Sequence, residues 1–265
     1  MALYCLVSAG GCPGVTTTAL GLALTWTRPV LLAECDPCHR SILPGFLAER
    51  LTQPPGPGLL GLAMETQHGS SIAPEAVDPY AISLDGEAGR ARLLHGIHDP
   101  RHAAELGPLW PALAELFATM DGDVIADVGC VGGSDTPTAL LARADLVVMV
   151  VRRTLPQVDA ARPRLEVLRD TLARSPVLCV INDGPYETAA VRKALFDLPV
   201  IGELPRASSE ARVLSDGVRP RRTFRTSQLV RTLGGLGRRM RNALDQRAVE
   251  HEGHALVAPT SFGGA

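Results

Sequence analysis

The feature that most constrains the fold is a glycine-rich turn that joins an apolar run to a helical pattern near the start of the chain. Residues 3–8 read LYCLVS, the turn at 9–14 reads AGGCPG, and residues 15–18 read VTTT. In a strand–loop–helix unit of this kind, backbone N–H groups and the positive end of the helix dipole bind phosphate oxygens. The pattern therefore predicts a phosphate-binding loop whose backbone extends from Gly11 to Thr17.

A loop of this type normally contains a lysine that the present chain lacks. The usual ending is Gly-Lys-Thr, in which the lysine neutralises phosphate charge and the threonine hydroxyl holds Mg²⁺. Here Gly14-Val15-Thr16 stands in that place, and Lys193 is the only lysine in the sequence. Thr16 is also favourable at a helix N-terminus, so capping is the alternative to Mg²⁺ binding. The loop thus keeps the backbone cradle without its cation, which puts catalytic activity in question.

The composition is typical of one large globular domain or two small ones. The 265 residues are 46% apolar and 20% charged, and the formal net charge of −2 does not indicate a protein that binds polyanions over its whole surface. No run of 18 apolar residues occurs, which predicts no membrane-spanning helix. The apolar start leads directly into the turn, so we expect a buried first strand rather than a signal peptide. We therefore also expect a cytoplasmic location and reduced cysteines.

Apolar runs bounded by turn residues alternate with helical patterns along the chain. This alternation predicts a three-layer α/β fold with a doubly wound, mostly parallel sheet, in which ligands bind at the carboxyl ends of the strands. We expect one domain at 1–246, a Pro/Gly/Ser-rich surface excursion at 52–74 and a disordered tail at 247–265. The predicted strands lie near 2–8, 29–34, 91–96, 123–127, 145–151, 176–181 and 199–203, and the predicted helices near 15–27, 107–120, 136–143, 157–173, 187–195, 208–216 and 226–246.

Several further segments match one family in order and spacing. Glu34-Cys35-Asp36-Pro37 follows the second apolar run, residues 123–129 read DVIADVG, residues 180–183 read VIND and residues 198–205 read LPVIGELP. Together with the glycine-rich turn, these segments resemble the ParA/MinD group of deviant P-loop ATPases over about residues 3–240. Within that group the chain is similar to the short MinD-like proteins.

The resemblance implies binding of ATP or ADP with Mg²⁺ and a role for each matched residue. Asp36 would orient the attacking water, and Asp127 would join Thr16 on Mg²⁺. Asn182 would contact the adenine, and Pro205 would lie at the strand end that closes over the base. The implied phosphate-binding residues are Gly11, Cys12, Gly14, Val15, Thr16 and Thr17.

The chain departs from the family at both lysines of the loop. Gly10 replaces the lysine that reaches across a nucleotide-sandwich dimer, and Val15 replaces the lysine that contacts phosphate in its own subunit. The loss of both positive charges argues against fast hydrolysis. Three arginines predicted at the carboxyl ends of strands are candidate replacements: Arg152, Arg153 and Arg206.

The six cysteines fall into two groups. Cys5 and Cys179 lie within predicted strands and are expected to be small core residues. A metal or iron–sulfur site on the other four is disfavoured, because two well-spaced CxxC pairs are missing. A redox-sensitive site and plain small residues are the other interpretations. In the expected fold these four surround the position of the γ-phosphate: Cys12, Cys35, Cys38 and Cys130.

The segment 218–241 is strongly basic, with eight arginines and no acidic residue. The first interpretation is a last helix that packs on the sheet with a solvated outer face. The next is a non-specific DNA surface at Arg219–Arg241, because clustered arginines pair with phosphates whatever the net charge. A membrane-surface helix is less favoured, since Gly234-Gly235 interrupts it. The apolar residues at helical spacing are Leu229, Leu233, Leu236, Met240 and Leu244.

These observations favour a degenerate nucleotide-binding switch, or pseudo-ATPase, that acts in positioning, partitioning or regulation through protein contacts. Its partner would be another protein, such as an active relative, or a second copy in a homodimer. One alternative is an active ATPase that cycles between monomer and dimer, with an arginine in place of the loop lysine. The other is a nucleotide-free scaffold, in which Cys12-Pro13 fills part of the phosphate space because proline removes one amide donor.

Overall fold

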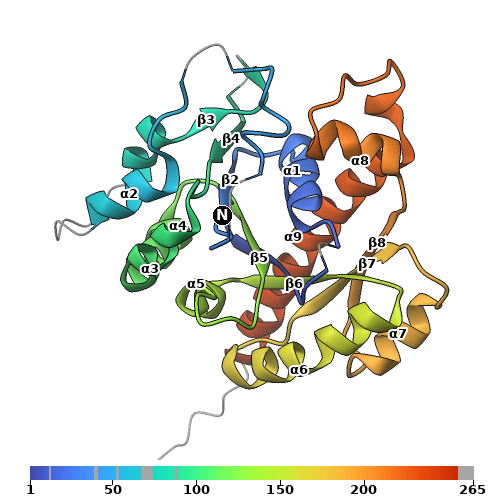
Figure 1. Ribbon diagram of the computed structural model, residues 1–265. Coiled ribbons are helices and arrows are strands. Elements are labelled where there is room, and N and C mark those ends of the chain that lie inside the picture. The colour runs from blue at the N-terminus through green and yellow to red at the C-terminus, as the bar shows by residue number, and fades with distance from the viewer. Residues whose placement is uncertain (12, 39–40, 52–53, 67–73, 87–88, 256–265) are drawn as a thin grey trace, which may run out of the picture.

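An eight-stranded sheet, parallel except at one edge, forms the centre of the molecule (Figure 1). The computed structural model describes residues 1–11, 13–38, 41–51, 54–66, 74–86 and 89–255. The strand order is β3-β4-β2-β5-β1-β6-β7-β8, and only the β3–β4 pair is antiparallel. The strands are β1 Leu3–Ser8, β2 Val30–Glu34, β3 Ile82–Ser83, β4 Ala91–Leu94, β5 Asp123–Cys130, β6 Leu146–Arg152, β7 Val177–Asn182 and β8 Val200–Pro205.

Helices cover both faces of this sheet, which confirms the predicted three-layer α/β fold. One face packs against α1, α8 and α9, and the other against α2, α4, α5, α6 and α7. In the described residues the α-helices are α1 Val15–Thr25, α2 Gly58–Thr66, α3 Ala103–Leu106, α4 Trp110–Thr119, α5 Thr138–Arg143, α6 Leu155–Thr171, α7 Thr188–Ala194, α8 Ser208–Ser215 and α9 Gln228–Ala255. Short 3-10 turns occupy Pro74–Tyr80, Pro100–His102, Gly107–Leu109 and Phe224–Thr226.

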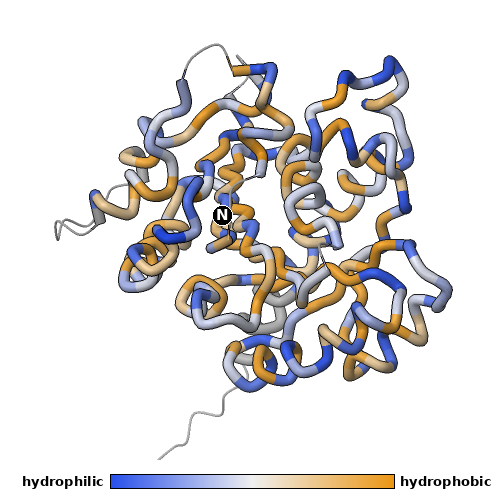
Figure 2. The backbone as a smooth tube through the Cα atoms, viewed as in Figure 1, coloured by the Kyte–Doolittle hydropathy of each residue, from blue (hydrophilic) through white to orange (hydrophobic). Residues whose placement is uncertain are grey.

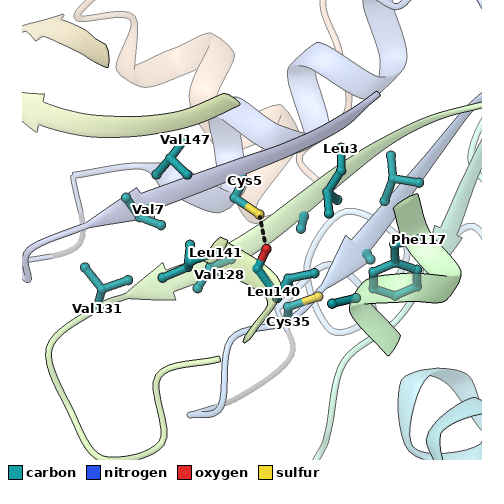
Figure 3. Close-up of a cluster of buried hydrophobic side chains, with 14 of the residues drawn as sticks. Leu3, Cys5, Val7, Cys35, Phe117, Val128, Val131, Leu140, Leu141 and Val147 are labelled. Carbon is teal, nitrogen blue, oxygen red and sulfur yellow. Dashed lines mark hydrogen bonds between the residues drawn. The ribbon is translucent and has the colours of Figure 1, made fainter. Parts of the chain in front are cut away.

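The first strand shows why continuous apolar runs become central strands. All six residues of β1 are buried, and successive side chains enter opposite layers. Leu3, Cys5 and Val7 pack toward α4 and α5, where Cys5 Sγ donates to the Leu140 carbonyl at 3.9 Å (Figure 3). The hydropathy of the backbone trace follows the same division, with hydrophobic residues concentrated along the central strands (Figure 2). A strand that is buried on both faces therefore has no polar alternation in its sequence.

All seven predicted strands and all seven predicted helices are present, with most ends shifted by no more than three residues. Strand β3 was not predicted, because two residues at a sheet edge carry no periodic signal. The end of the last helix was predicted near 246, whereas α9 extends to Ala255. Within the segment 52–74, α2 inserts Leu59 and Leu62 into the core. The proposed division into domain and tail stays a prediction.

A buried polar contact holds the first helix to the sheet. Trp26 follows α1, and its Nε1 donates to Asp123 Oδ2 at 2.8 Å. Tyr4 packs edge-on against the Trp26 ring at 5.2 Å between centroids, and the Arg241 guanidinium stacks on the same ring at 5.0 Å. Both tryptophans are core residues, since Trp26 and Trp110 are each at most 5% exposed. None of the described helices combines the length and the apolar character needed to cross a membrane.

Candidate functional site

The predicted phosphate loop connects β1 to α1. Gly10, Gly11 and Gly14 have φ values of 128°, 67° and 108°, in the left-handed region that favours glycine. Gly14 occupies the N-cap position, and its carbonyl accepts hydrogen bonds from the Thr18 backbone N–H at 2.9 Å and the Thr18 hydroxyl at 2.8 Å. The first amides of a helix have no intrahelical partners, so they can bind a ligand. Cys12, the remaining predicted loop residue, lies outside the described residues.

A glutamine from a distant part of the chain braces this loop. Gln157, in the first turn of α6, donates from Nε2 to the Gly10 carbonyl at 2.7 Å. A Cβ at Gly11 would lie 2.4 Å from the same Nε2, so a larger residue there would displace the Gln157 amide, and the φ of 67° itself favours glycine. Gln157 is only 9% exposed. Nothing in the sequence points to this role, because one polar side chain in the first turn of a helix gives no signal of a contact 147 residues away.

The two positions at which the family carries lysine supply no positive charge in this structure. Val15 is 6% exposed and belongs to the buried cluster between the sheet, α1 and α9. Its side chain is therefore part of the core. Gly10 has no side chain, and Lys193 lies in α7, away from the turn in sequence. The fold has incorporated the substituted position into its packing.

Asp127 is a fully buried carboxylate beside the loop. It lies in β5, paired in register with Leu6 of β1 and Glu34 of β2. The Thr16 side chain hydrogen-bonds to this carboxylate, and the Gly129 N–H donates to Oδ1 at 3.2 Å. Burial raises the pKa of Asp127 to about 7, and the Thr16 hydrogen bond opposes this shift. Thr16 and Asp127 thus meet as the resemblance implies.

Asp36 connects the segment after β2 with the end of β5. Its Oδ1 accepts from the Cys38 N–H at 2.8 Å. Its Oδ2 lies against Gly129, where an added Cβ would come within 2.0 Å of that oxygen. Gly129 has a φ of 67°, so both its backbone conformation and its contact with Asp36 favour glycine. Asp36 is half-buried, at the same edge of the sheet as Asp127.

Glu34 has a structural role that the sequence analysis missed. This carboxylate is 2% exposed, and its Oε1 accepts from the Ser41 N–H at 2.8 Å and the Ile42 N–H at 2.9 Å. Its Oε2 accepts from the Gly96 N–H at 3.2 Å. Buried carboxylates need such donors. Glu34 therefore ties the ends of β2 and β4 together behind the candidate site, and an acid that closes an apolar run is the sequence signal for it.

A cavity of about 340 Å³ lies between the loop and the ends of β7 and β8. Two residues of the predicted binding site, Pro205 and Thr17, line it. Asn182 is not among its lining residues, although both of its chain neighbours are. The Asn182 Oδ1 is buried and has no hydrogen-bond partner in the described part of the chain. The walls are Pro13, Gly14, Thr17, Thr18, Arg152, Ile181, Asp183, Leu204, Pro205, Arg206, Ala207, Ser208, Ala211, Leu229 and Leu233.

Two of the three candidate arginines lie on this cavity, and Asp183 contacts both. The Arg206 guanidinium lies 3.0 Å from the Asp183 carboxylate, and the Arg152 guanidinium lies 3.8 Å from the same carboxylate. Arg153 instead approaches Glu187 at 4.0 Å and does not line the cavity. Asp183, for which no sequence signal indicated such a role, thus forms ion pairs with both guanidinium groups.

Comparison with known proteins rests on structure alone. No family model and no curated protein matches the sequence. MinD from Pyrococcus horikoshii, solved with Mg-ADP, has a TM-score of 0.68 at 14% identity, covering 89% of this chain and 94% of that one. A ParA family ATPase from Chlorobium tepidum has a TM-score of 0.71 at 12% identity, over 89% and 97% of the two chains. The chain has the MinD/ParA fold. At these identities the comparison establishes the fold alone.

A third neighbour extends the comparison within the MinD/ParA fold. An aspartate-to-alanine variant of Cyanothece McdA, solved in complex with ATP, has a TM-score of 0.66 at 17% identity, over 91% of this chain and 96% of that one.

The donor set at the loop of our chain suits the hard cation of a Mg-nucleotide complex, because Thr16 and Asp127 offer only oxygen. The buried, unpartnered Asn182 Oδ1 is a group that a hydrogen-bond donor would satisfy.

The four thiols for which a metal or iron–sulfur site was disfavoured differ in burial. Cys35 is 1% exposed, whereas Cys38 and Cys130 are exposed. Cys12 lies outside the described residues. Among the residues that are described, the structure holds no group of three or more His, Cys, Asp or Glu side chains arranged for a metal ion.

Proposed function

We propose that this chain is a nucleotide-binding switch with the MinD/ParA fold, whose hydrolysis of ATP is slow or lost. It would act in positioning, partitioning or regulation through protein contacts. The observation that carries the proposal is the combination of the left-handed loop glycines among the described residues with a buried Val15. The loop keeps its left-handed glycines and its helix N-terminus, which bind phosphate through the backbone. It has lost the ammonium group that neutralises charge during phosphoryl transfer.

The proposed roles follow the position of each residue. The backbone of Gly11–Thr17, including Cys12 and Val15, would hold the phosphates, with Gln157 keeping the turn in shape. Thr16 and Asp127 would hold Mg²⁺, which when bound neutralises phosphate charge. Asp36 would orient water.

The base would bind in the cavity beyond the loop. Pro205 lines that cavity, as do both chain neighbours of Asn182, whose buried Oδ1 is unsatisfied among the described residues. The exocyclic amine of adenine is a donor that such an oxygen accepts.

A second candidate function is an active ATPase that uses arginine as its cation. Arg206 favours this reading, because it lies on the cavity wall and 68% of its side chain is exposed. In the structure Asp183 holds Arg206 and Arg152. An active ATPase of this kind therefore requires the nucleotide phosphates to displace Asp183 from these arginines.

The proposed partner is a protein. One neighbour is a MinC:MinD complex from Aquifex aeolicus, and another is a putative plasmid partition protein from Borrelia burgdorferi bound to AMPPNP. By analogy we propose a second copy of this chain, or an active relative, as the partner. A nucleotide-free scaffold stays the third alternative.

Binding and turnover distinguish these functions. Calorimetry with ATP and ADP, with and without Mg²⁺, measures binding, and phosphate release measures turnover. We expect binding without measurable turnover in the wild type, and binding about tenfold tighter in Val15→Lys, equivalent to about 1.4 kcal/mol. Lys193→Ala, an exposed change in α7, is the control.

Two results would overturn the proposal. Wild-type turnover that is lost in Asp36→Ala would establish the active ATPase. Absence of binding in the wild type and in a folded Val15→Lys would establish the scaffold.

A further inference from the structure

Two exposed thiols lie at the edge of the sheet where the candidate site is found. Cys38 follows β2 by four residues, and Cys130 is the last residue of β5. They are 92 positions apart in sequence, but β2 and β5 are neighbours in the sheet. Because parallel strands end at the same edge, the two segments emerge side by side.

A single side chain connects the two segments. Asp36 accepts a hydrogen bond from the Cys38 N–H at 2.8 Å, and its other oxygen lies against Gly129, the residue before Cys130. The Cys130 sulfur in turn lies 3.9 Å from the position of a Cβ at Gly10, over the phosphate loop. Cys38 and Cys130 thus lie on either side of the contact between Asp36 and Gly129.

We propose that Cys38 and Cys130 form a redox-sensitive thiol pair that peroxide closes into an intramolecular disulfide. The bond would join the segment that carries Asp36 to the end of β5, across the edge of the candidate site. It is a modification site in its own right, whether or not nucleotide binds.

The chemistry balances with peroxide as the oxidant. One thiolate attacks hydrogen peroxide, which breaks the O–O bond and yields a sulfenic acid and hydroxide. The second thiol attacks the sulfenic sulfur, forms the S–S bond and expels water after proton transfer. In total, two thiols lose two electrons and two protons, and the peroxide becomes two molecules of water.

The other described cysteines lie out of reach of peroxide. Cys5, Cys35 and Cys179 are each at most 1% exposed, and burial raises the pKa of all three thiols. Such residues react slowly because the thiolate is the nucleophile. The difference in exposure gives the proposed pair its selectivity.

The pair itself should respond to pH. Burial and the nearby Asp36 raise the pKa of Cys38, with Cys130 and Asp135 acting in the same direction. A larger thiolate fraction at alkaline pH should therefore speed closure between pH 7 and pH 9.

Peptide mapping of the whole protein tests the pair directly. The reduced full-length chain is treated with hydrogen peroxide, the remaining thiols are alkylated, and a non-reducing digest is analysed by mass spectrometry. We expect one crosslink between the peptides of Cys38 and Cys130, a loss of about 2 Da relative to the two thiols, and recovery with a reductant. The crosslink should be absent in Cys38→Ser and Cys130→Ser and present in Cys179→Ser, the buried control.

Several outcomes would overturn the proposal. A disulfide between Cys130 and Cys12, a crosslink between two chains, or only sulfenic and sulfinic acids would each show that Cys38 is not the partner. Because the wild type alone gives the map, a variant that fails to fold does not hide the answer. The map requires no nucleotide, so it can fail or succeed independently of the proposed function.

Discussion

At the scale of single residues, burial has a strong effect on the carboxylate of Asp127. Its pKa rises from the usual 3.8 to about 7 in the folded protein, because the side chain is buried. Between these values the folded protein keeps a proton that the unfolded chain has released. The free energy of unfolding should therefore fall as pH rises from about 4 to about 7 and then level off.

The Asp127→Asn variant checks this pH dependence, because its side chain does not titrate. Urea unfolding from pH 4.5 to pH 8, without Mg²⁺ or nucleotide, gives the curve for each protein. We expect the wild type to lose more stability than the variant across the window, by up to about 4 kcal/mol for a shift of about three units. Parallel curves for the two proteins would show that Asp127 does not carry this proton.

Glu34 gives a second prediction at this scale. A glutamine there accepts from Ser41 and Ile42 through one oxygen, but its amide group then meets the Gly96 N–H, and two donors face each other. We expect Glu34→Gln to destabilise the fold by about 1–3 kcal/mol, measured from the urea midpoint at an unchanged slope. Glu49→Gln, at an exposed position, is the matched control, and equal midpoints for both variants would refute the role assigned to Glu34.

Gln157 is the residue through which α6 should influence the phosphate loop. Replacing it with glutamate puts a carboxylate 2.7 Å from the Gly10 carbonyl and removes the donor. We expect Gln157→Glu to weaken nucleotide binding by at least about tenfold, while Gln157→Met, which removes the hydrogen bond without adding charge, has a smaller effect. Calorimetry on both variants measures this, and unchanged affinity in Gln157→Glu would contradict the bracing role.

At the scale of elements, the approach of the β2 and β5 ends depends on one glycine. An alanine at position 129 combines a φ of 67° with a Cβ that meets Asp36 at 2.0 Å, whereas an alanine at position 86 has a φ of 70° and nothing within 4 Å. We expect Gly86→Ala to cost about 1 kcal/mol from backbone strain alone and Gly129→Ala to cost roughly 2–4 kcal/mol, because Asp36 must move. Thermal or urea unfolding of both variants separates the two causes, and equal losses would show that the Asp36 contact carries no energy.

The elements themselves were predictable from sequence, whereas the contacts between them were not. The strands are continuous apolar runs, and a run such as residues 3–8 specifies burial on both faces without reference to the rest of the chain. The motifs also picked out Thr16 and Asp127, which hydrogen-bond to each other in the structure, and their proposed role as Mg²⁺ ligands stays a prediction. Gln157 and Asp183 were missed, because each acts through partners far away in sequence that no local pattern encodes.

At the scale of the whole molecule, a nearly neutral chain concentrates positive charge on one segment. The formal net charge is −2, yet eight arginines lie in residues 218–241, beside α8 and along α9. The structure assigns two of them to packing: Arg239 donates to the Ile201 carbonyl at 2.6 Å, and Arg241 stacks on Trp26. Hydrophilic residues are concentrated in the segment between α8 and α9 (Figure 2). Arg221 and Arg222 lie there, exposed to solvent.

This asymmetry leads to a test of the predicted DNA surface. Arg221→Gln/Arg222→Gln and Arg174→Gln/Lys193→Gln change the net charge equally, and all four residues are exposed. If the basic segment binds DNA, only the Arg221→Gln/Arg222→Gln protein should show weaker retention of non-specific duplex DNA. Its slope of log K against log salt should also be smaller by about 2, because each lost phosphate contact removes about 0.9 from that slope. Equal effects of the two pairs in a salt titration would mean that net charge alone governs retention, and the basic face would then be only the solvated side of a packed helix.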